Sequence, residues 1–369
     1  MIIDVHCHIG FSARRTDPSV DRFTFERNGA AGHPGFDSYF SPRLTSRAAW
    51  FFVRRWLGVD PRLQPGDVMD AEIARVYERH WSRMPSVNRV VLLAFDEYHD
   101  DAGHVIGPAN RRSRRGSDLY SSNSFVATYC RSNPSRYLFG ASIHPYRSAD
   151  GRTAVDMLEE VAGGATRPVL VKWLPIHQNI RADDPRTIAF LRRAAGLGIA
   201  ILVHYGGEMS LSRQHMEFEH PAPMLAVLRR LRAENAMPTV IVAHLATPSF
   251  PWQSRDGFET LAAALTGEFR DAPLYADISA LAAFGRTRWL PVLADRPDLQ
   301  QKVVWGSDFP IPAMLWPYWR RLDRATRRRI ASISSWVEQD YQLKQAFGLS
   351  PEVFTRAAGI LGVSADSGE

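Results

Sequence analysis

Eight short apolar runs, separated by segments of helical spacing, constrain the fold of this chain more than any other feature. The runs cover residues 1–10, 89–95, 137–144, 168–174, 198–205, 239–245, 274–279 and 302–308. Runs of this kind are typical of strands buried on both faces, and strands that alternate with helices form a parallel sheet. Eight such units are the number that closes a (β/α)8 TIM barrel, so we expect an α/β fold of this class.

Apolar residues at helical spacing predict the helices that cover these strands. They are expected over residues 66–85, 121–132, 153–163, 184–196, 221–234, 258–269 and 286–294, with two more between 334 and 361. Asp184 followed by Pro185 is a typical helix start, because the carboxylate caps the backbone and proline fits the first turn. In the C-terminal pair, Ser350 and Pro351 begin the second helix, and both helices are expected to pack outside or under the barrel.

Length alone does not fix the number of domains. The 369 residues are enough for two domains, yet one barrel with insertions reaches the same length. We therefore expect a single domain over residues 1–369, with insertions at about 11–66 and 96–117. The first insertion is rich in Arg, Pro, Gly and aromatic residues, which favours a packed lid or an oligomer contact over a loose loop.

Composition and charge are those of an ordinary globular protein. The chain is 45% hydrophobic and 23% charged, with a formal net charge of +6. Its arginines are mostly scattered, and the clusters at 111–115 and 320–329 are interpreted as solvated surface, so no nucleic-acid partner is expected. Two cysteines make no disulfide framework, and the sequence has neither a signal segment nor a long apolar run. We expect no membrane contact and a cytoplasmic location.

Polar residues stand where the apolar runs end. His6 and His8 lie two positions apart, so both point to one face of a strand. The other strand-end candidates are Lys172, His204, His244 and Asp308. Each alone has a structural alternative, such as a hydrogen-bonded core histidine or a capping carboxylate. In a barrel the carboxyl ends of the strands meet at one face, where active sites lie, so we expect all six residues to converge.

These motifs, in this order, resemble those of the amidohydrolase superfamily. The resemblance is to the amidohydrolase-related branch, which includes aminocarboxymuconate semialdehyde decarboxylase and bacterial TIM-barrel metal-dependent hydrolases. It is carried by Asp4-Val-His-Cys-His8, Val171-Lys-Trp-Leu-Pro175, Leu202-Val-His-Tyr205, Val242-Ala-His244 and Trp305-Gly-Ser-Asp-Phe-Pro310. The likeness runs from residue 2 to about 361, apart from the two insertions. The set is specific for a superfamily and does not name a substrate.

The resemblance implies that His6, His8, His204 and Asp308 bind a divalent metal, most often zinc. The chemistry agrees, because neutral imidazoles and one carboxylate suit zinc and leave a position open for water. Zinc lowers the pKa of bound water toward about 7, which supplies a nucleophile at neutral pH. By the same resemblance, Asp308 accepts a proton from that water. His244 either acts as acid or base and orients the substrate, or binds a second metal.

Lys172 leaves the number of metal ions open. In the binuclear members of the superfamily, a lysine on the fourth strand is carbamylated and bridges two metals, and histidines on strands five and six bind the second ion. Lys172, His204 and His244 match that set. The branch that this chain most resembles usually works with one metal, and the lysine then binds an anionic substrate. We expect one Zn2+ per chain, with the binuclear site as the alternative.

Four residues at strand ends or in the following loops are expected to contact a small-molecule substrate: His144, His177, Asn179 and Tyr205. Gln178 and Asp277 are further candidates, and about half of this group is expected to serve loop structure instead. The aromatic residues of 11–66 and the arginine cluster at 111–115 are placed to roof the pocket and attract a substrate carboxylate.

The predicted reaction is hydrolysis, in which activated water attacks a C–N or C–O bond of a small, carboxylate-bearing substrate. The alternative is metal-dependent, non-oxidative decarboxylation of an aromatic or unsaturated carboxylic acid, in which an acid–base residue protonates carbon. A barrel that binds a ligand without catalysis would have an incomplete ligand set, and here every expected ligand is present. The sequence is compatible with a homo-oligomer.

Overall fold

A ring of eight parallel strands forms the centre of the computed structural model, which describes residues 1–10, 38–45, 51, 54–55, 57–60, 62–63, 67–109, 115–149 and 151–364. The strands are β1 (Ile3–His8), β3 (Arg89–Leu93), β5 (Tyr137–Ala141), β8 (Leu170–Trp173), β9 (Ala200–His204), β10 (Val240–Ala243), β11 (Leu274–Asp277) and β12 (Val303–Val304). They pair in this order. Hydrogen bonds from His8 N to Phe309 O and from Asp308 N to His6 O close the ring. The expected TIM barrel is confirmed.

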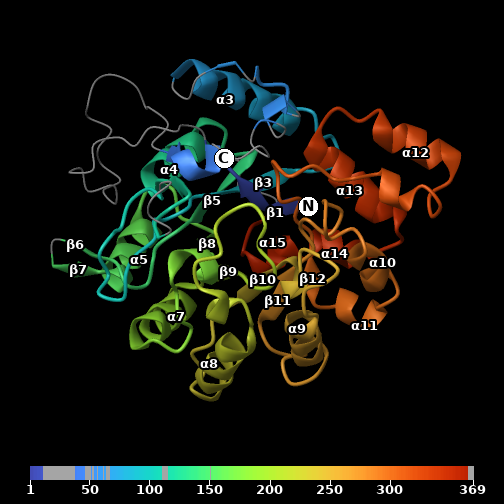
Figure 1. Cartoon of the computed structure of the whole chain (residues 1–369). Coiled ribbons are helices and arrows are strands. Elements are labelled where there is room, and N and C mark those ends of the chain that lie inside the picture. The colour runs from blue at the N-terminus through green and yellow to red at the C-terminus, as the bar shows by residue number, and fades with distance from the viewer. Residues whose placement is uncertain are drawn as a thin grey trace.

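Helices surround the ring on its outer side (Figure 1). Those between the strands are α3 (Asp67–Trp81), α4 (Asn123–Ser132), α5 (Ala154–Gly163), α7 (Pro185–Leu197), α8 (Ala222–Ala233), α9 (Asp256–Thr266), α10 (Trp289–Ala294) and α11 (Pro297–Gln300). Helix α7 begins as predicted, since Asp184 accepts a hydrogen bond from Arg186 N and Pro185 occupies the first turn. The helix expected from residue 286 starts three residues later, at Trp289.

Two apolar layers hold the barrel together. Inside the ring, the side chains of Val5, Leu93, Leu202 and Val304 belong to one buried cluster. A larger cluster fills the space between the strands and the outer helices. Ala357, at the C-terminal end of the chain, joins the inner cluster, so this segment packs against the barrel interior. The interior is therefore a core rather than a pore, and polar groups are left to the strand ends.

The C-terminal region differs from the expected pair of helices. It forms α12 (Arg324–Ala331), α13 (Trp336–Ala346), α14 (Pro351–Thr355) and α15 (Ala357–Ile360). The single helix expected from Ser350 is interrupted at Arg356. Helix α12 was not predicted, because Ile330 is its only buried residue and no apolar stripe marks it. Its start is capped by Asp323, whose side chain accepts a hydrogen bond from Thr326 N.

Smaller elements lie around the mouth of the barrel. They are β2 (Ser38–Phe40) and β4 (Leu119–Ser121), which pair antiparallel, the hairpin of β6 (Ser148–Ala149) and β7 (Arg152–Thr153), and the short helices α1 (Pro42–Thr45) and α6 (Pro175–Gln178). The described part of the 96–117 insertion is packed, and Asp96 forms a buried ion pair of 2.7 Å with Arg147. Most of the predicted lid at 11–66, and Arg111, Arg112 and Arg114, lie outside the described residues.

The longest helix among the described residues is α3, with 15 residues. In this part of the chain, no helix combines the length and the apolar character needed to cross a membrane.

Candidate metal centre

The side chains of His6, His8 and Asp308 meet at the carboxyl ends of β1 and β12. The Nε2 atoms of His6 and His8 lie 3.4 Å and 3.3 Å from Oδ1 of Asp308. His6 is fully buried, whereas the side chain of His8 is 24% exposed. We name these three residues the candidate metal centre, because one ligand atom from each lies within 4.8 Å of the others.

Backbone geometry brings Asp308 to this point. Its φ of 67° lies in the left-handed region, which costs a residue with a side chain about 1–2 kcal/mol. The Asp308 N–H donates to His6 O, and the buried carboxylate of Asp4 accepts hydrogen bonds from His6 N and Ser307 N. These bonds hold the segment after β12 against β1, so the two ligand-bearing stretches keep a fixed register.

Asp277 sets the tautomer of His6. Its Oδ2 lies 2.8 Å from His6 Nδ1, and because a carboxylate accepts, Nδ1 carries the proton. Burial, together with the charge of Lys172, holds the pKa of His6 well below its usual range. The ring is therefore neutral, and the lone pair of Nε2 faces Asp308. A carboxylate behind a ligating histidine is typical of metal sites.

The charge state of Asp308 also suits a metal ligand. Burial alone would raise the pKa of Asp308, but the hydrogen bond from His8 and the nearby His6 and Lys172 hold it well below its usual range. Asp308 is therefore a carboxylate at neutral pH. On the other side, the buried Nδ1 of His8 has no hydrogen-bond partner among the described residues. The imidazoles of His6 and His8 and the carboxylate of Asp308, with one ligand atom each, form a donor set that fits a divalent ion.

His204 and His244 lie beside the candidate metal centre, at the ends of β9 and β10. The ring centroid of His244 is 5.1 Å from that of His6 and 4.8 Å from that of His204. Nε2 of His204 lies 3.2 Å from Gly207 O and 3.8 Å from Oε2 of Glu208. The structure thus brings three of the four predicted zinc ligands together and places the fourth next to His244.

Hydrogen bonds fix the orientation of His244. The backbone N–H of His244 donates a hydrogen bond to Asp277 Oδ1. The ring atom Nδ1 lies 2.9 Å from Ser279 O. Since a carbonyl accepts, Nδ1 carries the proton and Nε2 carries the lone pair of the neutral ring. Burial, with the charge of Arg286, holds the pKa of His244 well below its usual range. His244 is therefore set to accept a proton at Nε2.

Lys172 enters the same group from β8. The side chain is buried, and its Nζ lies 3.1 Å from His6 Nε2. Burial lowers the pKa of Lys172 to about 8, although the charges of Asp277, Asp308 and Glu208 oppose this shift. Lys172 therefore lies beside the candidate metal centre, as the sequence predicted. Its amine loses a proton more easily than that of an ordinary lysine.

The four predicted substrate contacts are engaged with the protein itself. Both ring nitrogens of His144 and of His177 have protein partners, and Asn179 Nδ2 donates to two acceptors in the segment after β3. Tyr205 is buried and packs in the outer apolar cluster. These positions support the loops around the mouth, so they do not enter the proposed substrate contacts below.

Several residues at the site were missed from the sequence. Asp277 was a candidate for either a substrate contact or a structural role, and it lies behind His6 and His244. Ser279, Glu208 and Arg286 were not singled out, although Ser279 Oγ lies 2.8 Å from His244 Nδ1. These residues follow strand ends in irregular loops, where no periodic spacing marks a side chain that points inward. Arg286 is buried, and burial is not visible in a sequence.

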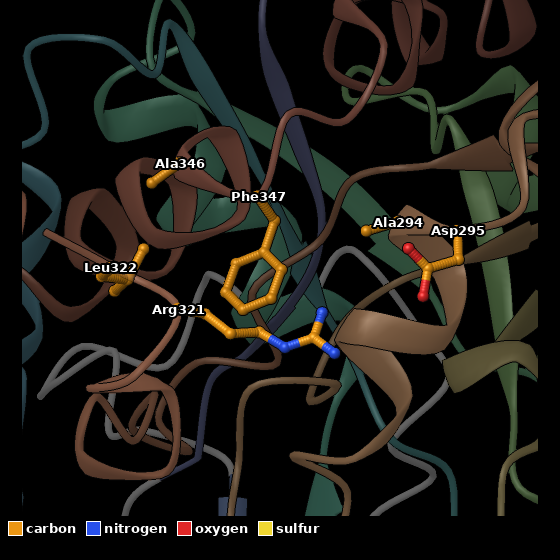
Figure 2. Close-up of a pocket in the computed structure, with 6 residues that line it drawn as sticks. All are labelled: Ala294, Asp295, Arg321, Leu322, Ala346 and Phe347. Atoms are coloured by element: carbon orange, nitrogen blue, oxygen red, sulfur yellow. The ribbon is translucent and has the colours of Figure 1, made fainter.

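A hollow of about 360 Å³ lies away from the strand ends (Figure 2). It is lined by Ala294, Asp295, Arg321, Leu322, Ala346 and Phe347. Its lining residues come from α10, α13 and the segment before α12, and they include a single carboxylate and no histidine. The hollow therefore offers no group of metal ligands.

Comparisons with known proteins bear on the fold. No protein-family model and no curated protein matches the sequence. An uncharacterized TIM-barrel protein from Bordetella bronchiseptica matches in structure with a TM-score of 0.55 at 14% identity, over 98% of this chain and 99% of that chain. A probable 2-pyrone-4,6-dicarboxylic acid hydrolase from Acinetobacter baumannii follows, with a TM-score of 0.47 at 12% identity, over 98% of this chain and 99% of that chain.

A 5-carboxyvanillate decarboxylase from Sphingomonas paucimobilis has a TM-score of 0.44 at 14% identity, over 96% of this chain and 98% of that chain. The hydrolase and the decarboxylase are too distant from this chain to carry an argument about its reaction. The match to the Bordetella TIM-barrel protein agrees with the barrel described above. The chain is thus similar in fold to known TIM-barrel proteins.

Proposed function

We propose that this protein is a metal-dependent hydrolase of the amidohydrolase superfamily that acts on a small molecule. The observation that carries the proposal is the convergence of His6 Nε2, His8 Nε2 and Asp308 Oδ1 beside a neutral His244. The same four residues carry much of the sequence resemblance to that superfamily, so sequence and geometry support one site. The donor set matches the ligands that Zn2+ prefers.

We propose one ion per chain, held by His6, His8 and Asp308. A second group of converging atoms comes from His6, His244 and Asp277, but hydrogen bonds already engage the ligand atoms there. His6, His8 and Asp308 would hold a Zn2+ ion, which would supply Lewis-acid chemistry and lower the pKa of water at the site. Lys172 remains the residue through which a second ion would have to be held, as a carbamate.

His244 and Lys172 have different roles in the proposed hydrolysis. His244 takes the proton of the attacking water at Nε2, because its pKa keeps the ring neutral at neutral pH. Lys172 donates a hydrogen bond to the negative oxygen that develops on the substrate, from an amine in a buried, weakly screened site.

Two parallel assays test this proposal. The zinc-loaded protein is given a panel of esters, lactones and amides with titration of the acid released, and a panel of aromatic carboxylic acids with detection of carbon dioxide. We expect acid release that stops when zinc is removed by a chelator and returns when zinc is added. His244→Asn should lower the rate about 10²- to 10⁴-fold, because the general base is lost. His104→Asn, at an exposed histidine, serves as the control.

Each result decides between the reactions. Carbon dioxide without acid release would contradict hydrolysis and support the decarboxylase. Acid release that is unaffected by zinc removal would contradict a metal-dependent site of either kind.

A further inference from the structure

Helix α13, on the outer side of the barrel, is hydrogen-bonded to the segment that leads to Asp308 (Figure 1). The side chain of Lys344 is fully buried, and its Nζ donates hydrogen bonds of 2.9 Å to Gly306 O and 2.6 Å to Asp340 Oδ2. The same oxygen of Asp340 accepts a 3.0 Å hydrogen bond from Trp305 Nε1. Lys344 and Asp340 thus form an ion pair on α13 that contacts the two residues directly after β12.

Strand pairing does not by itself place Asp308. Strand β12 has two residues and ends at Val304, so Asp308 lies beyond the pairing of β12 with β11. The segment between them is held from two elements, since Asp308 N donates to His6 O on β1 and Gly306 O accepts from Lys344 on α13. A Cβ on Gly306 would lie 3.0 Å from His6 Cβ, so this segment packs closely against β1. The path to Asp308 therefore depends on α13 as well as on the barrel.

Stability alone does not account for this buried ion pair. Burying two charges removes their hydration, and apolar side chains of similar volume often give equal or greater stability. Burial raises the pKa of Asp340 to about 6, although Lys344 and the hydrogen bond from Trp305 oppose this shift. The fold therefore disfavours the charged form of Asp340, and the specific effect of the pair is the donor that it directs at Gly306 O.

We propose that Lys344, held by Asp340, is a positioning residue that sets the place of the Asp308 carboxylate in the candidate metal centre. This inference rests on the proposed function, because it concerns the same centre. Lys344 acts through the backbone, since its hydrogen bond fixes the carbonyl of Gly306, two residues before Asp308. Without this donor the carboxylate would have to be ordered when a metal ion binds, and the cost of that ordering lowers the affinity.

Metal binding tests the inference without turnover. Competition with a chromophoric chelator measures zinc affinity, and the visible spectrum of the cobalt-loaded protein reports the coordination geometry. Lys344→Met, which keeps a long side chain without the charge, should weaken zinc binding about tenfold and shift the cobalt bands. Lys302→Met is the matched control and should bind zinc as the wild type does. Lys302 is also a buried lysine, and it donates to the carbonyls of Arg270 and Ala272 at the start of β12.

A double variant separates positioning from stability. In Lys344→Met/Asp340→Asn no charge is buried alone, and the amide oxygen still accepts from Trp305 Nε1. Urea unfolding should therefore show this variant to be more stable than Lys344→Met. Its zinc affinity should stay as low as that of the single variant, because Gly306 O still lacks its donor.

Three results would overturn the inference: wild-type zinc affinity and cobalt bands in Lys344→Met, a zinc affinity that returns with stability in the double variant, or an equal loss of affinity in Lys302→Met. Should Lys344→Met fail to fold, the double variant decides, since wild-type zinc affinity there also overturns the inference. A wild type that binds neither metal would overturn the candidate metal centre and this inference with it. Metal binding as predicted, without any hydrolysis, would count against the proposed function alone.

Discussion

Asp277 determines which nitrogen of His6 faces the candidate metal centre. Its two oxygens serve different neighbours, since Oδ2 faces His6 Nδ1 and Oδ1 accepts hydrogen bonds from His244 N and Ser279 N. One buried carboxylate thus orients a ring of the candidate metal centre and the proposed general base together. Removing the charge of Asp277 is therefore expected to weaken metal binding.

Asp277→Asn should weaken zinc binding about 10- to 100-fold, because an amide no longer enforces the Nδ1–H tautomer of His6. Competition with a chromophoric chelator measures this affinity. Asp118→Asn is the matched control, since Asp118 is also a buried carboxylate that accepts hydrogen bonds, from Ser41 Oγ and Ser212 N. Zinc affinity that falls equally in both variants, or in neither, would contradict the role given to Asp277.

At the scale of single residues, the sequence predicted what lies on the strands. His6, His8 and His244 were found because they end apolar runs, and the strand period assigns the first two to one face. Glu208, Ser279 and Arg286 were missed because they lie in loops whose course depends on contacts between distant segments. The Gly206–Gly207 turn is an example, since a Cβ on Gly207 would lie 2.3 Å from Ser249 N.

Among the elements, α3 and α13 are joined by His80. Trp336 N donates a hydrogen bond of 3.1 Å to His80 Nδ1, and Ser335 Oγ donates to His80 O. Burial lowers the pKa of His80 to about 4, and the charges of Arg79 and Arg83 add to this effect. The ring therefore docks the two helices in its neutral form.

Acid should weaken this docking in a defined window. Because the pKa of His80 in the folded protein lies below its ordinary value of 6.5, the unfolded chain binds the proton first as the pH falls. The stability is therefore fully present above pH 6.5 and is lost toward pH 4. Between about pH 7 and pH 5, the wild type should lose about 2 kcal/mol more unfolding free energy than His80→Gln.

Urea unfolding of both proteins at the two pH values measures the difference. His104→Gln, at an exposed histidine, is the control and should lose as much unfolding free energy as the wild type. Parallel losses in the wild type and His80→Gln would show that the ring is not held neutral by the contact of α3 with α13.

Which elements were predictable depends on how each buries its side chains. Strand and helix positions around the ring follow from apolar periodicity, as in α7 with its Asp184 cap. Helix α12 buries only Ile330, and the strands β2 and β4 have three residues each. None of these three elements therefore gives a periodic apolar pattern. Pairing of β2 with β4 joins segments about eighty residues apart, which no local pattern encodes.

For the whole molecule, the closure of the barrel and the candidate metal centre involve the same residues. The hydrogen bonds that close the barrel run between His8 and Phe309 and between Asp308 and His6, which are the residues of the candidate metal centre and one neighbour. Eight alternating units made this architecture predictable, because few other folds satisfy them. The placement of His204 outside the three-ligand group was not predictable, because strand ends fix which face a residue occupies and leave its side-chain contacts to the loops.

Zinc content per chain tests the central claim most directly. Elemental analysis is made on the wild type, His8→Ala and the control His104→Ala after zinc loading and exhaustive dialysis. His8 is a partly exposed ligand, so its replacement should leave the fold intact. The account predicts about one zinc per chain in the wild type and the control, and little or none in His8→Ala. A wild type without zinc, or a His8→Ala variant with the full amount, would contradict it, and two ions per chain would contradict the single-ion site.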